Sequence, residues 1–202
     1  WSRIKKVQSD NMLISIKADG HSVTVEWVYD KAKKSLVLDK ALTRGENGVG
    51  KDLTSLFKNN IAQIPKPDVK FDCAVSYEAI ITYDKFEELS KATDDKYKNP
   101  RSTLSGIFSE KGQVYFKYIS LLPIRIKAKD EENFLSRTKQ LSILSEMENN
   151  ELLDFQTVSA DEVEEIYMYH EDNRLNNGNS VNFMYDGLVV ESLNEKSRKR
   201  LG

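Results

Sequence analysis

An apolar run meets a charged tetrapeptide in the stretch MLISIKADGHSV, residues 12–23. Lys17 and Asp19 stand two positions apart where a strand is expected to end, and residues i and i+2 of a strand point to the same face. An ammonium and a carboxylate aimed at one spot are typical of a lysine nucleophile beside its charge partner. They are equally typical of a surface ion pair, so this tetrapeptide alone leaves both interpretations open.

Further residues suited to chemistry lie downstream. Glu78 stands within the strand-like segment VSYEAII, and buried strand carboxylates are uncommon unless they are paired or metal-bound. Its same-face neighbours are Ser76, which favours exposure, and Ile80, which favours burial, so both orientations stay open. Arg101 follows a proline in KNPRST, and Asp186–Gly187 precedes the apolar segment LVVES. By themselves these read as a solvated arginine and a turn that enters a strand.

The segment GENGVGKD, residues 45–52, has the spacing of a phosphate-binding loop around Lys51. Such a loop needs glycines for close backbone approach, a lysine for the phosphates and a hydroxyl for Mg²⁺. Asp52 occupies the hydroxyl position and would bring like charge against the phosphate oxygens. The parallel sheet that this loop requires is not predicted. A phosphate-loop hydrolase is therefore a distant alternative, and a glycine-rich turn before a helix is the simpler interpretation.

Composition limits the classes to which the chain can belong. Of its 202 residues, 39% are hydrophobic and 31% charged, as in soluble globular proteins. Thirty basic and thirty-two acidic residues lack the basic excess that indicates nucleic-acid binding. A single cysteine and two histidines exclude a disulfide framework and a histidine-rich metal site. No apolar run approaches the ~18 residues of a membrane span, and no signal peptide opens the chain, so a cytoplasmic, reducing setting is predicted.

The hydrophobic pattern predicts strands and helices that would position these residues. Strands are expected at 12–17, 22–29, 35–43, 73–82, 113–119, 123–127 and 186–193. Helices are expected at 52–64, 84–91 and 131–148, with another after a capping box at 159–162. The polar segment 92–103 is expected to be a loop. The aromatic residues Tyr115, Phe116 and Tyr118 are expected in the core and on the strand surface rather than as a base-stacking platform. Several strands adjacent in sequence predict an α+β fold of mainly antiparallel sheets flanked by helices.

Taken in order, these segments resemble the adenylation domain of NAD-dependent DNA ligases. The chain shows K-x-D-G at 17–20, TRGENGVGKDLT at 43–54, YEAIITYDKFEELS at 77–90, KNPRSTLSGIF at 98–108 and MYDGLVVESLN at 184–194. The match runs from about residue 12 to the end, in the family's order and spacing. The resemblance implies a nucleotidyltransferase fold, with residues 1–202 forming one domain that stops before the segment carrying the family's last motif lysine.

The resemblance also implies a covalent mechanism. Lys17 would attack the α-phosphate of NAD, expel nicotinamide mononucleotide and hold AMP as a phosphoramidate. Asp19 would orient Lys17 or bind the ribose, and Arg44 and Arg101 would neutralise phosphate charge in the transition state. The sequence leaves the choice between NAD and ATP open. Nicked DNA is the implied substrate, and no membrane partner is expected.

The remaining implied roles concern nucleotide and metal binding. Glu78 and Asp186 would serve the ribose or Mg²⁺, whose preference for oxygen ligands suits carboxylates. Gly20 and Gly187 complete the two glycine-containing motifs at the nucleotide. Ser15 falls at the nucleotide too, where the family usually has a glutamate that reads adenine.

Two further positions depart from the family pattern. Ser109 replaces a second arginine, and Glu191 replaces a lysine, which reverses a charge beside the expected phosphate site. One hypothesis is a phage-type split ligase, in which a second subunit supplies the missing cations. The other is a degenerate, non-catalytic subunit that binds nucleotide or DNA with the same fold. The enzyme hypothesis is favoured because the chain keeps the main motif residues Lys17, Asp19, Glu78, Arg101 and Asp186.

Overall fold

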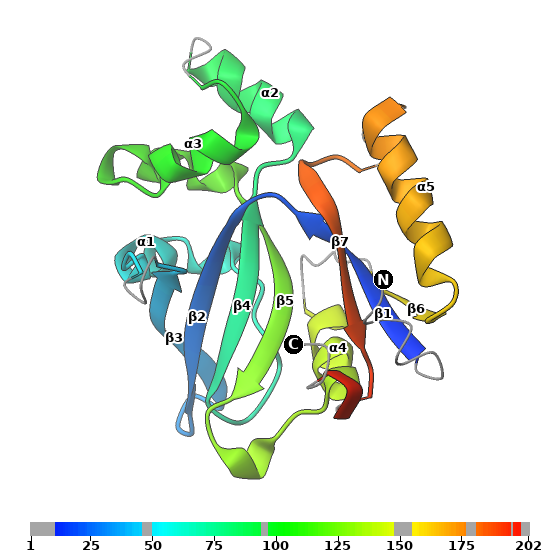
Figure 1. Ribbon diagram of the computed structural model, residues 1–202. Coiled ribbons are helices and arrows are strands. Elements are labelled where there is room, and N and C mark those ends of the chain that lie inside the picture. The colour runs from blue at the N-terminus through cyan, green and yellow to red at the C-terminus, as the bar shows by residue number, and fades with distance from the viewer. Residues whose placement is uncertain are drawn as a thin grey trace. The chain divides into compact units, whose positions relative to one another are not determined.

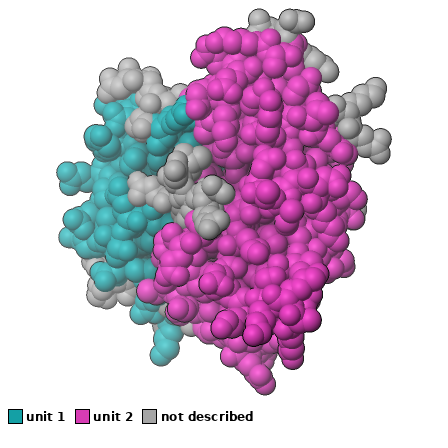
Figure 2. Space-filling view, turned by 180° about the vertical axis from the view of Figure 1, so that it is seen from behind, with its two compact units in different colours: residues 1–18, 154–202 teal, residues 19–153 magenta. Residues whose placement is uncertain are grey.

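The computed structural model of the chain describes residues 11–45, 50–93, 97–147, 155–176, 181–194 and 196–198 (Figure 1). The chain divides into two compact units, which Figure 2 shows in different colours. The small unit comprises residues 1–18 and 154–202, and the large unit comprises residues 19–153. That both belong to one domain stays a prediction.

The large unit is built on a four-stranded antiparallel sheet with the strand order β3-β2-β4-β5. Its strands are β2 (His21–Asp30), β3 (Ser35–Thr43), β4 (Cys73–Ile80) and β5 (Ser120–Ala128). Along β2, Val23, Val25 and Trp27 are buried and alternate with more exposed residues, because successive side chains point to opposite faces. One face of the sheet therefore forms the core of this unit.

Helices contribute the other half of that core. They are α1 (Thr54–Asn59), α2 (Tyr83–Ala92), α3 (Pro100–Ile107) and α4 (Arg137–Ser145), with short 3₁₀ helices η2 (Ile61–Gln63), η3 (Glu110–Tyr118) and η4 (Glu131–Asn133). Phe57 of α1 and Phe116 of η3 meet edge to face with ring centroids 5.3 Å apart. Such aromatic contacts contribute more than their buried area alone.

The small unit holds a three-stranded antiparallel sheet in the order β6-β1-β7. Its elements are β1 (Asn11–Ala18), β6 (Phe155–Ser159), α5 (Val163–Asn176) and β7 (Tyr185–Ser192). Met12 and Ile14 pack with Ala160 and Val163 in its core. Because β1 alternates, the odd-numbered residues of the strand, Lys17 among them, face away from that core. Among the described residues, no helix is long and apolar enough to cross a membrane.

The predicted α+β fold with antiparallel sheets is confirmed, but several elements differ from the prediction. The predicted strand 113–119 is the 3₁₀ helix η3, in which Phe116 and Tyr118 are buried while Val114 is 73% exposed. Two aromatic residues at i and i+2 imitate the alternation of a strand, although in a 3₁₀ helix such residues lie about 120° apart. The predicted helix 131–148 is shorter, because Ser136 caps α4 by accepting a hydrogen bond from the Lys139 amide.

Other elements also differ from their predicted boundaries. The predicted helix 52–64 divides into α1 and η2, the predicted loop 92–103 contains the start of α3, and β6 was not expected. The capping box at 159–162 is confirmed, since Glu162 accepts a hydrogen bond from the Ser159 amide at 2.8 Å and α5 follows. Short elements such as β6 carry too few residues to show a period.

Residues 51–53, which follow the glycine-rich segment, pair antiparallel with the end of β3. The Leu53 amide donates to the Ala41 carbonyl at 2.8 Å, and the Thr43 amide donates to the Lys51 carbonyl at 3.0 Å. Asp52 accepts a hydrogen bond from the Thr54 amide at 2.8 Å, and hydrogen bonding by Thr54 lowers the pKa of Asp52. Residues 46–49 lie outside the described residues. A phosphate-binding loop is not supported, because all strands that the structure describes pair antiparallel.

Gly20 has a structural role at the entry to β2. A Cβ atom at this position would lie 2.1 Å from the Ala79 carbonyl oxygen and 2.9 Å from Ile80 Cγ2. We therefore expect Gly20→Ala to separate β2 from β4 and to lower the free energy of unfolding by about 1–3 kcal/mol. Urea denaturation measures the change. Gly106→Ala is the control: it places a Cβ 3.2 Å from a Tyr97 ring atom within α3, and an equal loss there would contradict the prediction.

Candidate active site

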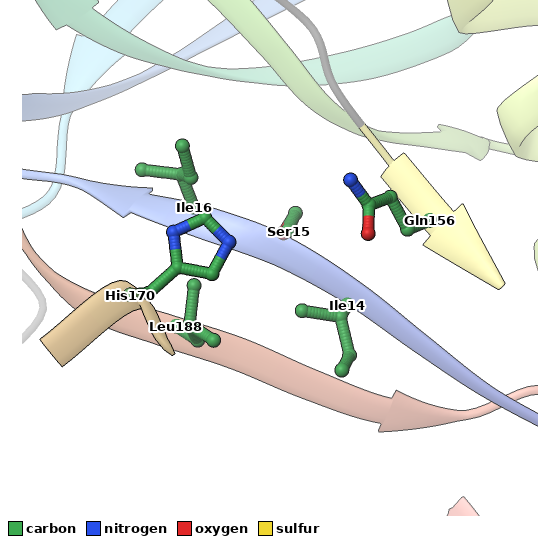
Figure 3. Close-up of a pocket in the computed structure, with 6 residues that line it drawn as sticks. All are labelled: Ile14, Ser15, Ile16, Gln156, His170 and Leu188. Carbon is green, nitrogen blue, oxygen red and sulfur yellow. The ribbon is translucent and has the colours of Figure 1, made fainter. Parts of the chain in front are cut away.

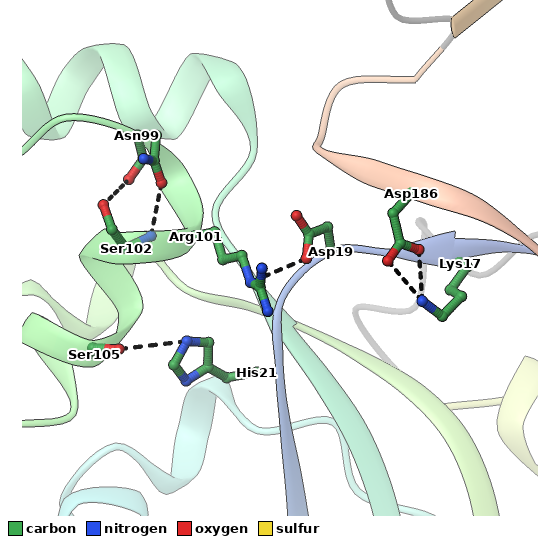
Figure 4. Close-up of polar contacts among 8 residues, drawn as sticks. All are labelled: Lys17, Asp19, His21, Asn99, Arg101, Ser102, Ser105 and Asp186. Atoms are coloured by element: carbon green, nitrogen blue, oxygen red, sulfur yellow. Dashed lines mark hydrogen bonds and ion pairs between the residues drawn. The ribbon is translucent and has the colours of Figure 1, made fainter.

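Lys17 lies near the end of β1, opposite Gly187 of β7. Its Nζ donates hydrogen bonds to both carboxylate oxygens of Asp186, at 2.8 and 2.7 Å (Figure 4). The two side chains are 54% and 47% exposed. A solvent-exposed ion pair is worth only about 0–1 kcal/mol. A ligand can therefore open this pair easily and reach the amine.

A β-bulge presents the Asp186 carboxylate. Lys17 is opposite Gly187 and Ala18 is opposite Tyr185, so Asp186 is an extra residue in β7 without a partner of its own in the register. A bulge bends its strand and re-aims side chains, which directs this carboxylate to the lysine. Gly187 follows with φ +155°, a conformation that residues with a side chain rarely adopt. The Asp-Gly motif is thus the sequence of a bulge.

Asp19 has a different partner from the one expected. β1 ends at Ala18, so the rule that places i and i+2 on one strand face does not extend to Asp19. In the large unit, the Nε of Arg101 lies 3.0 Å from Asp19 Oδ1 (Figure 4). Asp19 is 20% exposed and Arg101 is 58% exposed. The carboxylate therefore anchors a cation whose side chain remains open to a ligand.

The start of α3 positions Arg101. The Asn99 side chain accepts a hydrogen bond from the Ser102 amide at 2.8 Å, and Pro100 stands in the first turn, where its fixed φ suits a helix. The segment Asn-Pro-Arg is consequently a helix start that projects an arginine beside Asp19. The predicted loop at this segment is wrong because a helix of only eight residues shows too little of its period in the sequence.

His21, to which no role was assigned from the sequence, is a neighbour of this ion pair. Its Nε2 lies 3.4 Å from Ser105 Oγ of α3, and its ring meets Phe108 edge to face. Burial lowers the pKa of His21, and the nearby positive charge of Arg101 lowers it further, against the opposing effect of Asp19. Only its place directly after K-x-D-G could have drawn attention to this residue.

His21 should make stability depend on pH. Because its pKa in the folded chain lies below the usual 6.5, the unfolded chain binds more protons as the pH falls below that value. We therefore expect the free energy of unfolding to decrease as the pH falls from about 7 toward 5, and less steeply in His21→Gln. Urea denaturation at several pH values measures both slopes. Parallel slopes for the two proteins would contradict the prediction.

Glu78 and Arg44 reach the same end of the four-stranded sheet. Glu78 of β4 is half-buried and lies opposite Ser22 of β2, whose carbonyl accepts a hydrogen bond from the Arg44 amide at 3.0 Å. Glu78 thus lies on the face of the sheet opposite the core, neither fully exposed nor buried. Cys73 on the same strand is no rival nucleophile, since burial raises its pKa to about 12.

Ser15 shares its strand face with Lys17 but also borders a small hollow in the small unit. The hollow holds about 10 Å³, room for a water molecule at most, and is lined by Ile14, Ser15, Ile16, Gln156, His170 and Leu188 (Figure 3). This hollow cannot hold a nucleobase. The adenine contact expected at Ser15 stays a prediction.

Ser109 and Glu191, which stand where the family has cationic residues, both lie in described elements or at their ends. Ser109 Oγ donates a hydrogen bond to the Gly106 carbonyl, which closes the last turn of α3. Glu191 lies opposite Leu13, and the alternation of β1 puts it on the strand face that carries Lys17. Neither position offers a positive charge to a phosphate.

The expected Mg²⁺ ligands do not form a metal site by themselves. Among the described residues, no three His, Cys, Asp or Glu side chains are grouped so that they could hold a metal ion. Asp186 is paired with Lys17 in the small unit, and Glu78 belongs to the large unit. Mg²⁺ is commonly held by one or two carboxylates together with substrate phosphates. We therefore assign no chemical step to a metal.

Comparisons with known proteins agree with the motif order. A family model described as the NAD-dependent DNA ligase adenylation domain matches residues 1–202. A Lachnoclostridium phytofermentans DNA ligase is 28% identical over 187 residues, which are 88% of this chain and 26% of that protein. A Borreliella burgdorferi DNA ligase is 35% identical over 100 residues, 49% of this chain and 14% of that protein.

This chain spans about a quarter or less of the length of these relatives. Among solved structures, a Naegleria gruberi RNA ligase matches with a TM-score of 0.47 and 14% identity, covering 96% of this chain and 50% of that one. The family assignment rests on the family model, which covers the whole sequence. The chain belongs to the family of NAD-dependent DNA ligase adenylation domains.

Proposed function

We propose that the chain carries out the adenylation step of DNA ligation, with Lys17 as the residue that becomes linked to AMP. The observation that supports this most directly is the exposed Lys17–Asp186 pair at the bulge of β7. An accessible amine held by a weak ion pair can be released to a substrate. No described cysteine competes, because the single cysteine is buried.

The proposed reaction forms one bond and breaks one. After losing a proton to water, the Lys17 amine attacks the α-phosphorus of NAD and forms a phosphoramidate N–P bond. The P–O bond of the pyrophosphate bridge breaks, and nicotinamide mononucleotide leaves with the bonding electrons. Arg101, oriented by Asp19, and Arg44 stabilise the phosphate charge that grows in the transition state, while Glu78 binds the ribose.

The proposal extends to partners. Nicked DNA would receive the AMP at its 5′-phosphate, and a second subunit or segment would supply the cations that Ser109 and Glu191 do not provide. Relatives several times longer than this chain are named DNA ligases, which supports this extension. A cytoplasmic setting follows from the same proposal, since DNA and NAD meet there.

The alternative is a non-catalytic subunit that binds nucleotide or DNA. The loss of positive charge at positions 109 and 191 favours it, because removing one group that stabilises transition-state charge typically slows a reaction by about 10²–10³-fold. The two candidates differ in whether a covalent bond forms.

Intact-protein mass spectrometry separates the two candidates. The chain is incubated with Mg²⁺ and either NAD or ATP, and its mass is compared with that of the untreated chain. The proposed function predicts a gain of one AMP, and the nucleotide that supports it identifies the substrate. No adduct with either nucleotide, in the absence of DNA and over a range of pH, would overturn the proposal.

A further inference from the structure

The four-stranded sheet of the large unit has a polar face opposite its core. Ser76 and Glu78 of β4 alternate with buried core residues and therefore point away from the core. Thr24 of β2 lies opposite Ser76 in the register, and their hydroxyl oxygens are 3.5 Å apart. Ser22 lies opposite Glu78 on the same face. This face thus holds the carboxylate assigned above to the nucleotide.

Arg125 of β5 brings a positive charge to this face. It lies opposite Ser76 in the register, and its neighbour Ile126 is fully buried on the core side. Arg125 itself is half-buried. Directly opposite residues in a sheet have Cβ atoms about 5 Å apart, and diagonal neighbours about 7–8 Å. The register shifts between Ser76 and Tyr77, where Ile124 is the extra residue of β5, so Arg125 stays opposite Ser76 and is a diagonal neighbour of Glu78.

The chemistry of this side chain matches what the site lacks. The chain has no cation at positions 109 and 191, where the family pattern predicts phosphate-binding groups. A guanidinium offers donors in a planar fork that can bind two phosphate oxygens at once. Lys127 is the next residue of β5 on this face, but it lies opposite Ala74, four residues from Glu78, and is exposed. Arg125 is the better-placed cation.

We propose that Arg125 is a nucleotide-binding residue that contacts phosphate on the polar face of the sheet. The proposal rests on the proposed function, because that function makes an adenine nucleotide the ligand. It adds a specificity residue that the motif comparison does not contain. The position lies between the second and the last of the motif-bearing strands, in a segment that none of the motifs includes.

Nucleotide binding tests the assignment. Calorimetry with AMP and with adenosine is carried out on the wild-type chain, Arg125→Gln and the matched control Lys127→Gln. A charge-assisted hydrogen bond lost from phosphate predicts at least about tenfold weaker AMP binding in Arg125→Gln. Adenosine binding should stay unchanged, Lys127→Gln should bind AMP within about twofold of wild type, and Arg125→Lys should recover part of the loss.

Several results would overturn the proposal. An equal loss in Arg125→Gln and Lys127→Gln would show a general charge effect, and an equal loss for adenosine and AMP would exclude a phosphate contact. Failure of the wild-type chain to bind AMP would remove both this proposal and the proposed function. A wild-type chain that binds AMP through Arg125 but forms no adduct would overturn the proposed function alone. Thermal unfolding of each variant confirms that the fold is retained.

Discussion

Lys17→Ala should abolish the AMP adduct that the wild-type chain forms, because no other amine is held at the proposed position. Lys17→Arg should abolish it as well, for a more informative reason. A guanidinium keeps the positive charge and can pair with Asp186, but it cannot lose a proton to become a nucleophile. Loss of the adduct in Lys17→Arg would therefore show that the nucleophilic amine is needed, because the positive charge and the pairing with Asp186 are kept.

Intact-protein mass after incubation with nucleotide and Mg²⁺ measures the adduct. Lys33→Ala is a suitable control, since Lys33 also forms an exposed ion pair, with Asp30 at 3.5 Å, yet lies in the turn between β2 and β3. The control should form the adduct fully. A wild-type level of adduct in Lys17→Arg would show that another residue is the nucleophile.

Arg101→Ala should slow formation of the adduct by about 10²–10³-fold, the usual effect of removing a group that stabilises transition-state charge. The Asp19 carboxylate holds Arg101 in place, so Asp19→Asn should have a smaller effect in the same direction. Residues in direct contact do not act independently. The double variant should therefore be no slower than Arg101→Ala alone.

Single-turnover mass spectrometry gives these rates. Lys98→Ala serves as the control. This exposed lysine lies two residues before the start of α3 and does not belong to the Arg101–Asp19 ion pair. Arg101→Lys should fall between wild type and Arg101→Ala, since an ammonium keeps the charge but not the fork of donors. Additive effects of the two single variants would contradict a role for Asp19 in orienting Arg101.

Structure could be predicted best from the sequence where hydrophobic residues alternate along a long strand, or where neighbouring residues form a motif. β2 could be predicted because Val23, Val25 and Trp27 alternate with less buried residues. The Asn-Pro-Arg segment could be recognised as a motif, although the helix that it starts was too short to predict. η3 was mistaken for a strand because Phe116 and Tyr118 are two positions apart, which is the spacing of residues on one face of a strand. The choice between a strand and a 3₁₀ helix depends on which side chains are buried, and burial depends on the whole fold.

The pairing of charges could not be predicted from the sequence. Lys17 and its partner Asp186 are 169 positions apart, and their meeting depends on strand register and on an extra residue. Sequence proximity suggested Asp19 instead, because strand alternation was extended one residue beyond the end of β1. Apart from its place after K-x-D-G, His21 gave no signal, because its partners Ser105 and Phe108 come from α3 and the residue after it.

The bulge in β7 also exchanges the faces of odd- and even-numbered residues along that strand. Tyr185 is opposite Ala18 and Leu188 is opposite Ile16, so both belong to the same face although three positions separate them. Deleting Asp186 or Gly187 would leave one residue between Tyr185 and Leu188, so simple alternation would keep Leu188 and Val190 packed against the core of the small unit. Replacing Asp186 would remove only a carboxylate. Chain length at this point therefore decides whether an extra residue stands opposite the end of β1, and the identity of residue 186 decides which group meets Lys17.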